Sequence, residues 1–183
     1  HNFRTSADYV LDNKNTLGAA VNLSFNDNES ISNSRTPIIT RSTGVIDSIL
    51  LAPNRNESNT FNLNTNFNYR YRDTTGRSLM VDMNYGRYER DRYNFQPNFY
   101  TTADGTPLNE NITAQDTPIA IDIYVGKADY EQDMGKGKLS LGSKISFVKT
   151  DNTFDFFNIE NNVSTLDETR SNNFVYDEQI IAA

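Results

Sequence analysis

Residues that could support catalysis are scarce in this chain. The sequence contains no cysteine, and its single histidine is the first residue, His1. A thiolate nucleophile therefore cannot form. A serine–histidine pair or a histidine metal site could draw only on His1. We expect no enzymatic activity, no cofactor and no metal site.

Four aromatic residues in one polar stretch form the candidate set for ligand contact: Tyr93, Phe95, Phe99 and Tyr100. Aromatic rings have apolar faces that can stack on a sugar ring, so these residues could touch a solute from a loop. The competing interpretation is that the rings only anchor the segment by packing.

Several carboxylates lie close together further along the chain, at Asp151, Asp155, Glu160, Asp167 and Glu168. Such a group could hold calcium or a cationic ligand. A solvated acidic loop is the simpler interpretation and is the one we favour.

The composition excludes two classes of protein. The formal net charge is −7, which disfavours nucleic acid as a partner because phosphate binding needs a basic face. No stretch approaches 18 consecutive apolar residues, so no membrane-spanning helix is expected. At 36% hydrophobic and 11% aromatic residues, the chain is nevertheless too aromatic for plain disorder.

Residues 61–72 give the clearest structural signal. Phenylalanine, leucine, threonine and tyrosine occupy the odd positions, and asparagine or arginine occupies every even position. This period of two predicts a β-strand with one apolar and one polar face. Shorter runs with the same alternation lie at residues 3–11, 17–26 and 79–86. Residues 174–183 are expected to form a seventh strand, in which the adjacent Ile180 and Ile181 leave the two faces unseparated.

Turn residues divide these strands into hairpins. Short turns are expected at residues 12–15 and 73–77, where Asp, Asn and Gly cluster. A third hairpin pairs the apolar residues of 119–125 with those of 139–147, across a connection that contains Gly135 and Gly137. Because the apolar phase slips after Val125, we expect a β-bulge near Gly126.

Long polar stretches at about 27–59, 91–118 and 151–173 separate the hairpins, and we expect them to be loops. Outer-membrane β-barrels alternate short periplasmic turns with longer extracellular loops. The pattern therefore predicts an all-β antiparallel meander of long hairpins: a single segment, residues 1–183, of an outer-membrane β-barrel with about six or seven strands. The apolar run within 44–53 is expected to pack on a neighbouring loop or to form its own short strand.

The segments NFRTSADYVLDNKNTLGAAVNLSFNDNE (2–29), FNLNTNFNYRYR (61–72) and GKGKLSLGSKISF (135–147) resemble the barrel of TonB-dependent outer-membrane receptors of the Bacteroidetes type. This resemblance implies nutrient uptake across the outer membrane of a Gram-negative bacterium, with outer-membrane lipid, the remainder of the parent barrel, a plug domain and an energy-coupling protein as partners. We identify no plug domain in the sequence, and plugged transporters have about 22 strands, so we expect a fragment of the wall.

Two alternatives remain open at the level of sequence. Alternating strands also describe a secreted or surface-attached soluble β-sandwich that binds carbohydrate or protein. An outer-membrane hydrolase is the third reading, disfavoured by the shortage of histidine. If the segment folds alone in water, we expect it to self-associate or to curl into a compact barrel or sandwich, because its apolar face would otherwise stay exposed. The residues expected in that dry core are Leu17, Val21, Leu23, Phe67, Val81, Ile121, Leu141 and Ile145.

Overall fold

A computed structural model describes residues 1–182, which form one antiparallel sheet of nine strands. The expected all-β meander is confirmed. The strands are β1 (Asn2–Val10), β2 (Asn15–Ile39), β3 (Ile46–Arg72), β4 (Arg77–Thr101), β5 (Pro107–Asp116), β6 (Ile119–Met134), β7 (Gly137–Glu160), β8 (Val163–Leu166) and β9 (Asn172–Ala182).

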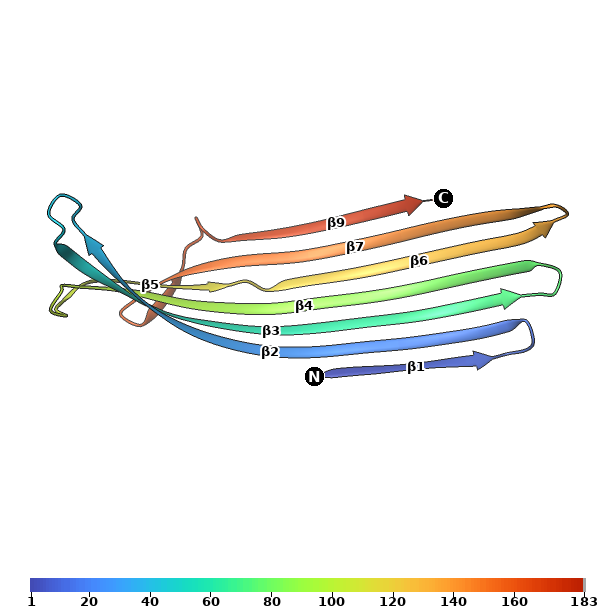
Figure 1. Ribbon diagram of the computed structural model, residues 1–183, viewed down its shortest axis with the longest axis horizontal. Helices are drawn as coiled ribbons and strands as arrows, with labels where there is room; N and C mark the ends of the chain where they lie inside the picture. Colours follow the sequence, from blue (N-terminus) through green and yellow to red (C-terminus); the bar gives the residue numbers. More distant parts are fainter. Residues whose placement is uncertain (183) are drawn as a thin grey trace.

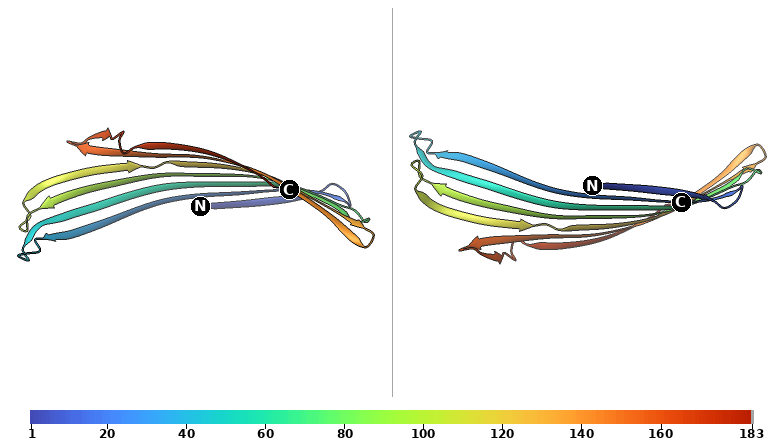
Figure 2. Two further views of the ribbon diagram at one scale, coloured as in Figure 1. Left: turned by 90° about the horizontal axis from the view of Figure 1, so that it is seen from above. Right: turned by 90° about the horizontal axis from the view of Figure 1, so that it is seen from below.

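The strands form a single layer that bends and twists along its length (Figures 1 and 2). β5 and β6 lie end to end between β4 and β7, and β8 and β9 lie end to end along the far side of β7. β1 is therefore one edge of the sheet, and β8 and β9 form the other. Within residues 1–182 these two edges do not pair with each other, and no helix is long and apolar enough to cross a bilayer.

Three short connections gather at one end of the sheet, on the right in Figure 1, and we call it the turn end. They join β1 to β2, β3 to β4, and β6 to β7, as the sequence predicts. In the second of them the Asp73 carboxylate accepts hydrogen bonds from the backbone N–H groups of Thr75 and Arg77, at 2.9 and 3.0 Å. Gly76 then takes a φ of 81°, a left-handed conformation that favours glycine.

The long polar stretches are strands rather than loops, so the prediction of three long loops is wrong. β2 continues to Ile39, β3 begins at Ile46 and β4 continues to Thr101, in an almost unbroken register. These segments have polar residues on both faces, so the alternation that marks a half-buried strand disappears. Their backbone ladders hold them together none the less. The apolar run after Gly44 opens β3.

The third hairpin exists, but its apolar residues do not pair as expected, because those of β6 and those of β7 lie on opposite faces. β6 pairs with both β4 and β7 without a register shift, so there is no bulge near Gly126. Tyr130 lies opposite Leu141, and Tyr124 lies opposite Phe147. The even-numbered residues of β6 therefore share a face with Leu141, and Ile119, Ile121, Ile123 and Val125 project from the other face.

The sheet has almost no core. Among the described residues only Ile49, Ala114 and Phe156 are buried hydrophobic residues, and all three lie far from the turn end. None of the eight residues expected in a dry core is buried: Phe67 and Leu141 are each 59% exposed. The compact packing expected for the segment alone is therefore wrong for this structure, which is an open sheet.

Candidate functional site

One face of the sheet carries a continuous apolar band beside the turn end, and we call it the outer face. In β3 the band runs from Phe61 to Tyr71 on odd-numbered residues, and the register places Val81 opposite Tyr69 and Met83 opposite Phe67. The apolar residues of these two strands therefore share one face. The band has the length that a tilted transmembrane strand needs, about 9 to 11 residues. Phe67 and Met83 are 59% and 61% exposed, as lipid-facing residues would be.

Aromatic and charged residues mark the far edge of this outer band. The Phe25 and Phe61 rings lie 5.1 Å apart, and the Tyr85 and Tyr124 rings lie 4.9 Å apart. Immediately beyond Tyr85, Arg87 pairs with Glu89 and, at 3.1 Å, with Asp122. Aromatic girdles followed by charge are typical of the boundary between hydrocarbon and water.

The opposite face, which we call the inner face, is a ladder of amide and hydroxyl side chains. The Asn62 amide donates to Ser24 Oγ at 3.2 Å, Asn66 donates to Asn84 Oδ1 at 2.8 Å, and Asn94 donates to Asn54 Oδ1 at 3.0 Å. No inner-facing residue is charged between residues 18 and 36 of β2, or between residues 48 and 68 of β3. This surface suits water and polar solutes.

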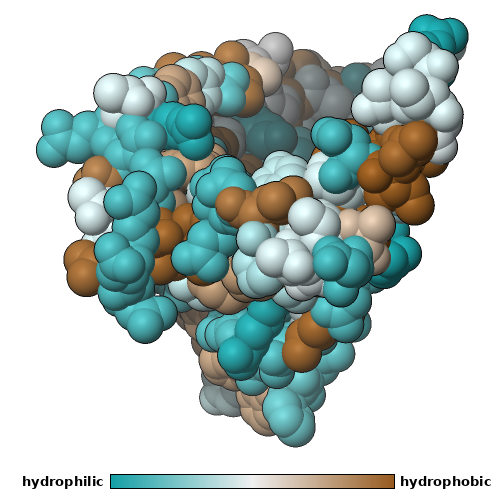
Figure 3. Space-filling view, turned by 90° about the vertical axis from the view of Figure 1, so that its left-hand side faces the viewer, coloured by the Kyte–Doolittle hydropathy of each residue, from teal (hydrophilic) through white to brown (hydrophobic). Residues whose placement is uncertain are grey.

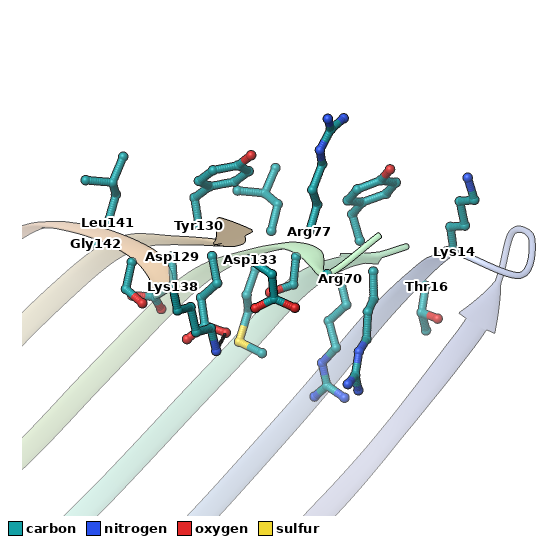
Figure 4. A pocket seen from close by; sticks show the side chains of 18 of the residues that line it. Lys14, Thr16, Arg70, Arg77, Asp129, Tyr130, Asp133, Lys138, Leu141 and Gly142 are labelled. Carbon is teal, nitrogen blue, oxygen red and sulfur yellow. Dashed lines mark ion pairs between the residues drawn. The ribbon is translucent and has the colours of Figure 1, made fainter. Parts of the chain in front are cut away.

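The inner face becomes charged at the turn end, where a hollow of about 860 Å³ opens. Arg70 and Arg72 of β3 and Asp129, Glu131 and Lys138 of β6 and β7 contribute to its lining. In Figure 4 the Arg70, Asp129 and Lys138 side chains project from one side of the sheet, and those of Arg77, Tyr130 and Leu141 project from the other. Lys138 pairs with Glu131 at 2.6 Å. The hollow at the turn end is therefore lined by both positively and negatively charged side chains.

Asp73 lies beside this hollow, in the β3–β4 turn and outside the apolar band. The hydrogen bond from the Arg77 backbone N–H and that from the Thr75 hydroxyl, the latter at 2.8 Å, stabilise its charged form. They lower the pKa of the Asp73 carboxyl to about 2. The carboxylate therefore fastens the turn at every physiological pH.

The four aromatic residues singled out in the sequence do not converge on one site. All lie in β4, where Tyr93, Phe95 and Phe99 project from the outer face and Tyr100 projects from the inner face. Their contact with a solute stays a prediction. Seen from the end far from the turns, hydrophobic patches remain exposed among hydrophilic residues (Figure 3).

The acidic residues singled out in the sequence are spread along and beyond β7. Asp151 and Asp155 project from the outer face, Glu160 projects from the inner face, and Asp167 accepts hydrogen bonds within the turn that follows β8. Among residues 1–182, no three His, Cys, Asp or Glu side chains are placed to hold a metal ion.

The charged hollow was missed at the sequence level, although its signal was present. Arg70 and Arg72 continue the asparagine parity of β3, which puts them on the polar face. Their neighbours Asp129 and Glu131 come from β6, a strand that the sequence does not show to lie beside β4. Sequence pattern alone could not bring the two groups together.

An antiparallel meander with an outward apolar band, aromatic edges and a polar opposite face is the wall of an outer-membrane β-barrel. The comparison with protein families agrees: the model of the outer membrane protein beta-barrel family matches residues 70–183, more than half of the chain. The chain belongs to this family, and its place is the outer membrane of Gram-negative bacteria. Among curated proteins, none matches the chain.

Proposed function

We propose that the chain is a wall segment of an outer-membrane receptor that takes up a nutrient, similar to the TonB-dependent receptors of the Bacteroidetes type. The observation that carries the proposal is the pair of dissimilar faces: an apolar outer band and a hydrogen-bonded polar inner face. A polar inner face belongs against water, a solute or a plug. The role is one of binding and passage rather than catalysis.

The open edges support a larger barrel. The free side of β1 and the free sides of β8 and β9 would leave unpaired backbone groups in contact with lipid, which a membrane does not tolerate. Further strands have to close the wall. The charged hollow at the turn end supplies ion-pairing groups where a plug domain inside the barrel would contact the wall.

The β-sandwich alternative needs two packed sheets. Residues 1–182 form one sheet with both faces open, and the family match places the chain in the outer membrane. The soluble sandwich is therefore wrong as an account of this chain.

The test is the energy dependence of solute uptake by cells that express the whole outer-membrane protein. A receptor of the proposed kind requires an energised inner membrane, so a protonophore abolishes accumulation beyond simple binding at the cell surface. A passive pore would continue to equilibrate the solute in the presence of the protonophore. That result would contradict the proposed function while leaving the barrel assignment intact.

A further inference from the structure

Two arginines stand together on the inner face of β4, just beyond the apolar band. Arg90 and Arg92 are two residues apart, so they project from the same face of the strand. The register places Thr60 and Ser58 of β3 opposite them, and Ile119 of β6 on the other side of Arg90. Their nearest cross-strand neighbours are therefore hydroxyl and apolar side chains.

Neither arginine forms an ion pair among the described residues. Arg92 Nε donates to Asn56 Oδ1 at 2.6 Å, and the Arg90 Nε atom is buried without a hydrogen-bond partner. Arg87 provides the contrast within the same strand: it projects from the outer face and pairs with both Glu89 and Asp122.

An arginine without an ion pair, beside a stretch of β2 and β3 whose inner face is uncharged, is suited to bind an anion. A buried donor without an acceptor is unfavourable, and a ligand that supplies the acceptor recovers that free energy. Arginine presents a planar fork of N–H donors that matches carboxylate and phosphate oxygens, so it binds these groups with two parallel hydrogen bonds. The inner face provides no competing carboxylate between residues 18 and 36 of β2 or between residues 48 and 68 of β3.

A second arginine pair on the inner face lies among side chains of both charge signs. Arg70 and Arg72 have the same spacing on the same face, but they line the hollow at the turn end together with Asp129, Glu131 and Asp133. None of these carboxylates forms an ion pair with Arg70 or Arg72, since Asp129 pairs with Lys127 and Glu131 pairs with Lys138, but their negative charges lie in the same hollow. The two pairs therefore differ in their surroundings and not in their chemistry.

We propose that Arg90 and Arg92 form a binding site for the carboxylate or phosphate group of an anionic solute, on the inner wall just above the membrane. The site deepens the proposed function, on which it rests, because it assigns a charge class to the solute. Asn56 positions Arg92, and the buried Arg90 Nε–H has no acceptor among the described residues.

The test is calorimetric binding of two probes, inorganic phosphate and succinate, to the whole outer-membrane protein in detergent at low ionic strength. The double variant Arg90→Gln/Arg92→Gln removes the site, and Arg70→Gln/Arg72→Gln removes the same charge at the turn end. We expect the first variant to bind at least one probe about tenfold more weakly, as the loss of charged hydrogen bonds implies, and the second to bind like the wild type. The probe that responds identifies the solute group as phosphate or carboxylate.

Equal loss in the two variants would overturn the site, since it would show only a general effect of charge. Absence of binding of both probes to the wild type, with a lower melting temperature of the Arg90→Gln/Arg92→Gln variant, would also overturn it, because the anion would then be a carboxylate of the same protein. If that variant does not fold, Arg90→Lys/Arg92→Lys keeps the charge without the fork, and wild-type binding by it would contradict the proposal.

The binding result is independent of energy coupling. A passive pore could bind phosphate at these arginines, and an energised receptor for a neutral solute would fail to do so. Failure of the anion site and failure of the proposed function are therefore distinguishable.

Discussion

The two halves of β2, β3 and β4 differ in how they distribute apolar and polar residues over the two faces of the sheet. Beside the turn end, β3 separates apolar from polar residues strictly, with Phe67 on one face and Asn66 on the other. Beyond the Arg87 ion pairs, in the distal half, both faces carry polar groups: Ser58 and Asn56 on the inner face, and Glu57 and Arg55 on the outer face. The backbone ladder continues through both halves in almost unbroken register.

The two halves differ because their outer faces meet different solvents, hydrocarbon beside the turn end and water in the distal half. In the turn-end half the outer face meets hydrocarbon, so a charged side chain there is expensive. In the distal half water reaches both faces, and the strands are held by backbone hydrogen bonds and neighbouring polar side chains. The point in a long strand where the apolar–polar alternation stops therefore marks the edge of the membrane.

The largest expected effect comes from a charge in the middle of the outer band. Phe67→Arg should destabilise the barrel by about 2 to 4 kcal/mol, the usual cost of arginine at the bilayer midplane. Asn64→Arg is the matched control on the inner face, where the side chain is outside the hydrogen-bonded ladder, and should change stability by less than about 0.5 kcal/mol. Urea titrations of the refolded whole protein in lipid measure both. Similar losses in the two variants would reverse or abolish the assigned faces.

A charge introduced at the edge of the apolar band locates the boundary between hydrocarbon and water more closely. Leu63 lies opposite Arg87, at the level where the ion pairs begin. Leu63→Arg should therefore cost only about 0 to 1 kcal/mol, the value near an interface. The same titration checks it, and a loss as large as that of Phe67→Arg would place the boundary further from the turns.

The β3–β4 turn should respond to a backbone constraint. Gly76→Ala should destabilise the protein by about 1 to 2 kcal/mol, because a side chain disfavours the left-handed conformation. A Cβ atom there would also lie 2.1 Å from an Asp133 carboxylate oxygen. Gly137→Ala is the control, since its Cβ atom would meet only the Met134 carbonyl oxygen, at 3.8 Å. Thermal unfolding compares the two, and a tolerated Gly76→Ala would contradict this turn geometry.

The smallest effect is a pH dependence of the same turn. The folded pKa of Asp73, about 2, lies below the ordinary value of 3.8, so its contribution to stability is complete above 3.8 and is lost as the pH falls towards 2. A carbon-detected NMR titration of the carboxyl group should show the low midpoint. Thr75→Val removes a donor and should raise that midpoint, and an unchanged midpoint would show that the hydroxyl is not bound to the carboxylate.

The turn-end half was the part of the fold that sequence could reveal. The two faces of residues 61–72 could be predicted because contact with lipid on one side requires apolar residues at every second position. Ile121 and Ile123 misled the face assignment of β6, because an apolar stripe on the inner face resembles a lipid-facing one. The distal strands were mistaken for loops because water on both sides imposes no pattern. The Arg90–Arg92 pair was overlooked for the same reason, since its shared face is visible only once residues 91–101 are known to be strand.

The central claim is that the outer face of β3 meets lipid beside the turn end and water in the distal half. The most direct test is a spin-label scan along β3 in the whole protein reconstituted in lipid. The present chain has no cysteine to interfere with single-cysteine labelling. From residue 61 to residue 71, oxygen accessibility should be high at odd positions and accessibility to a water-soluble nickel reagent should be high at even positions. From residue 53 to residue 60, the alternation in oxygen accessibility should disappear while backbone amides stay protected from hydrogen exchange. Alternation that continued unchanged to residue 53, or that was inverted within 61–71, would contradict the account.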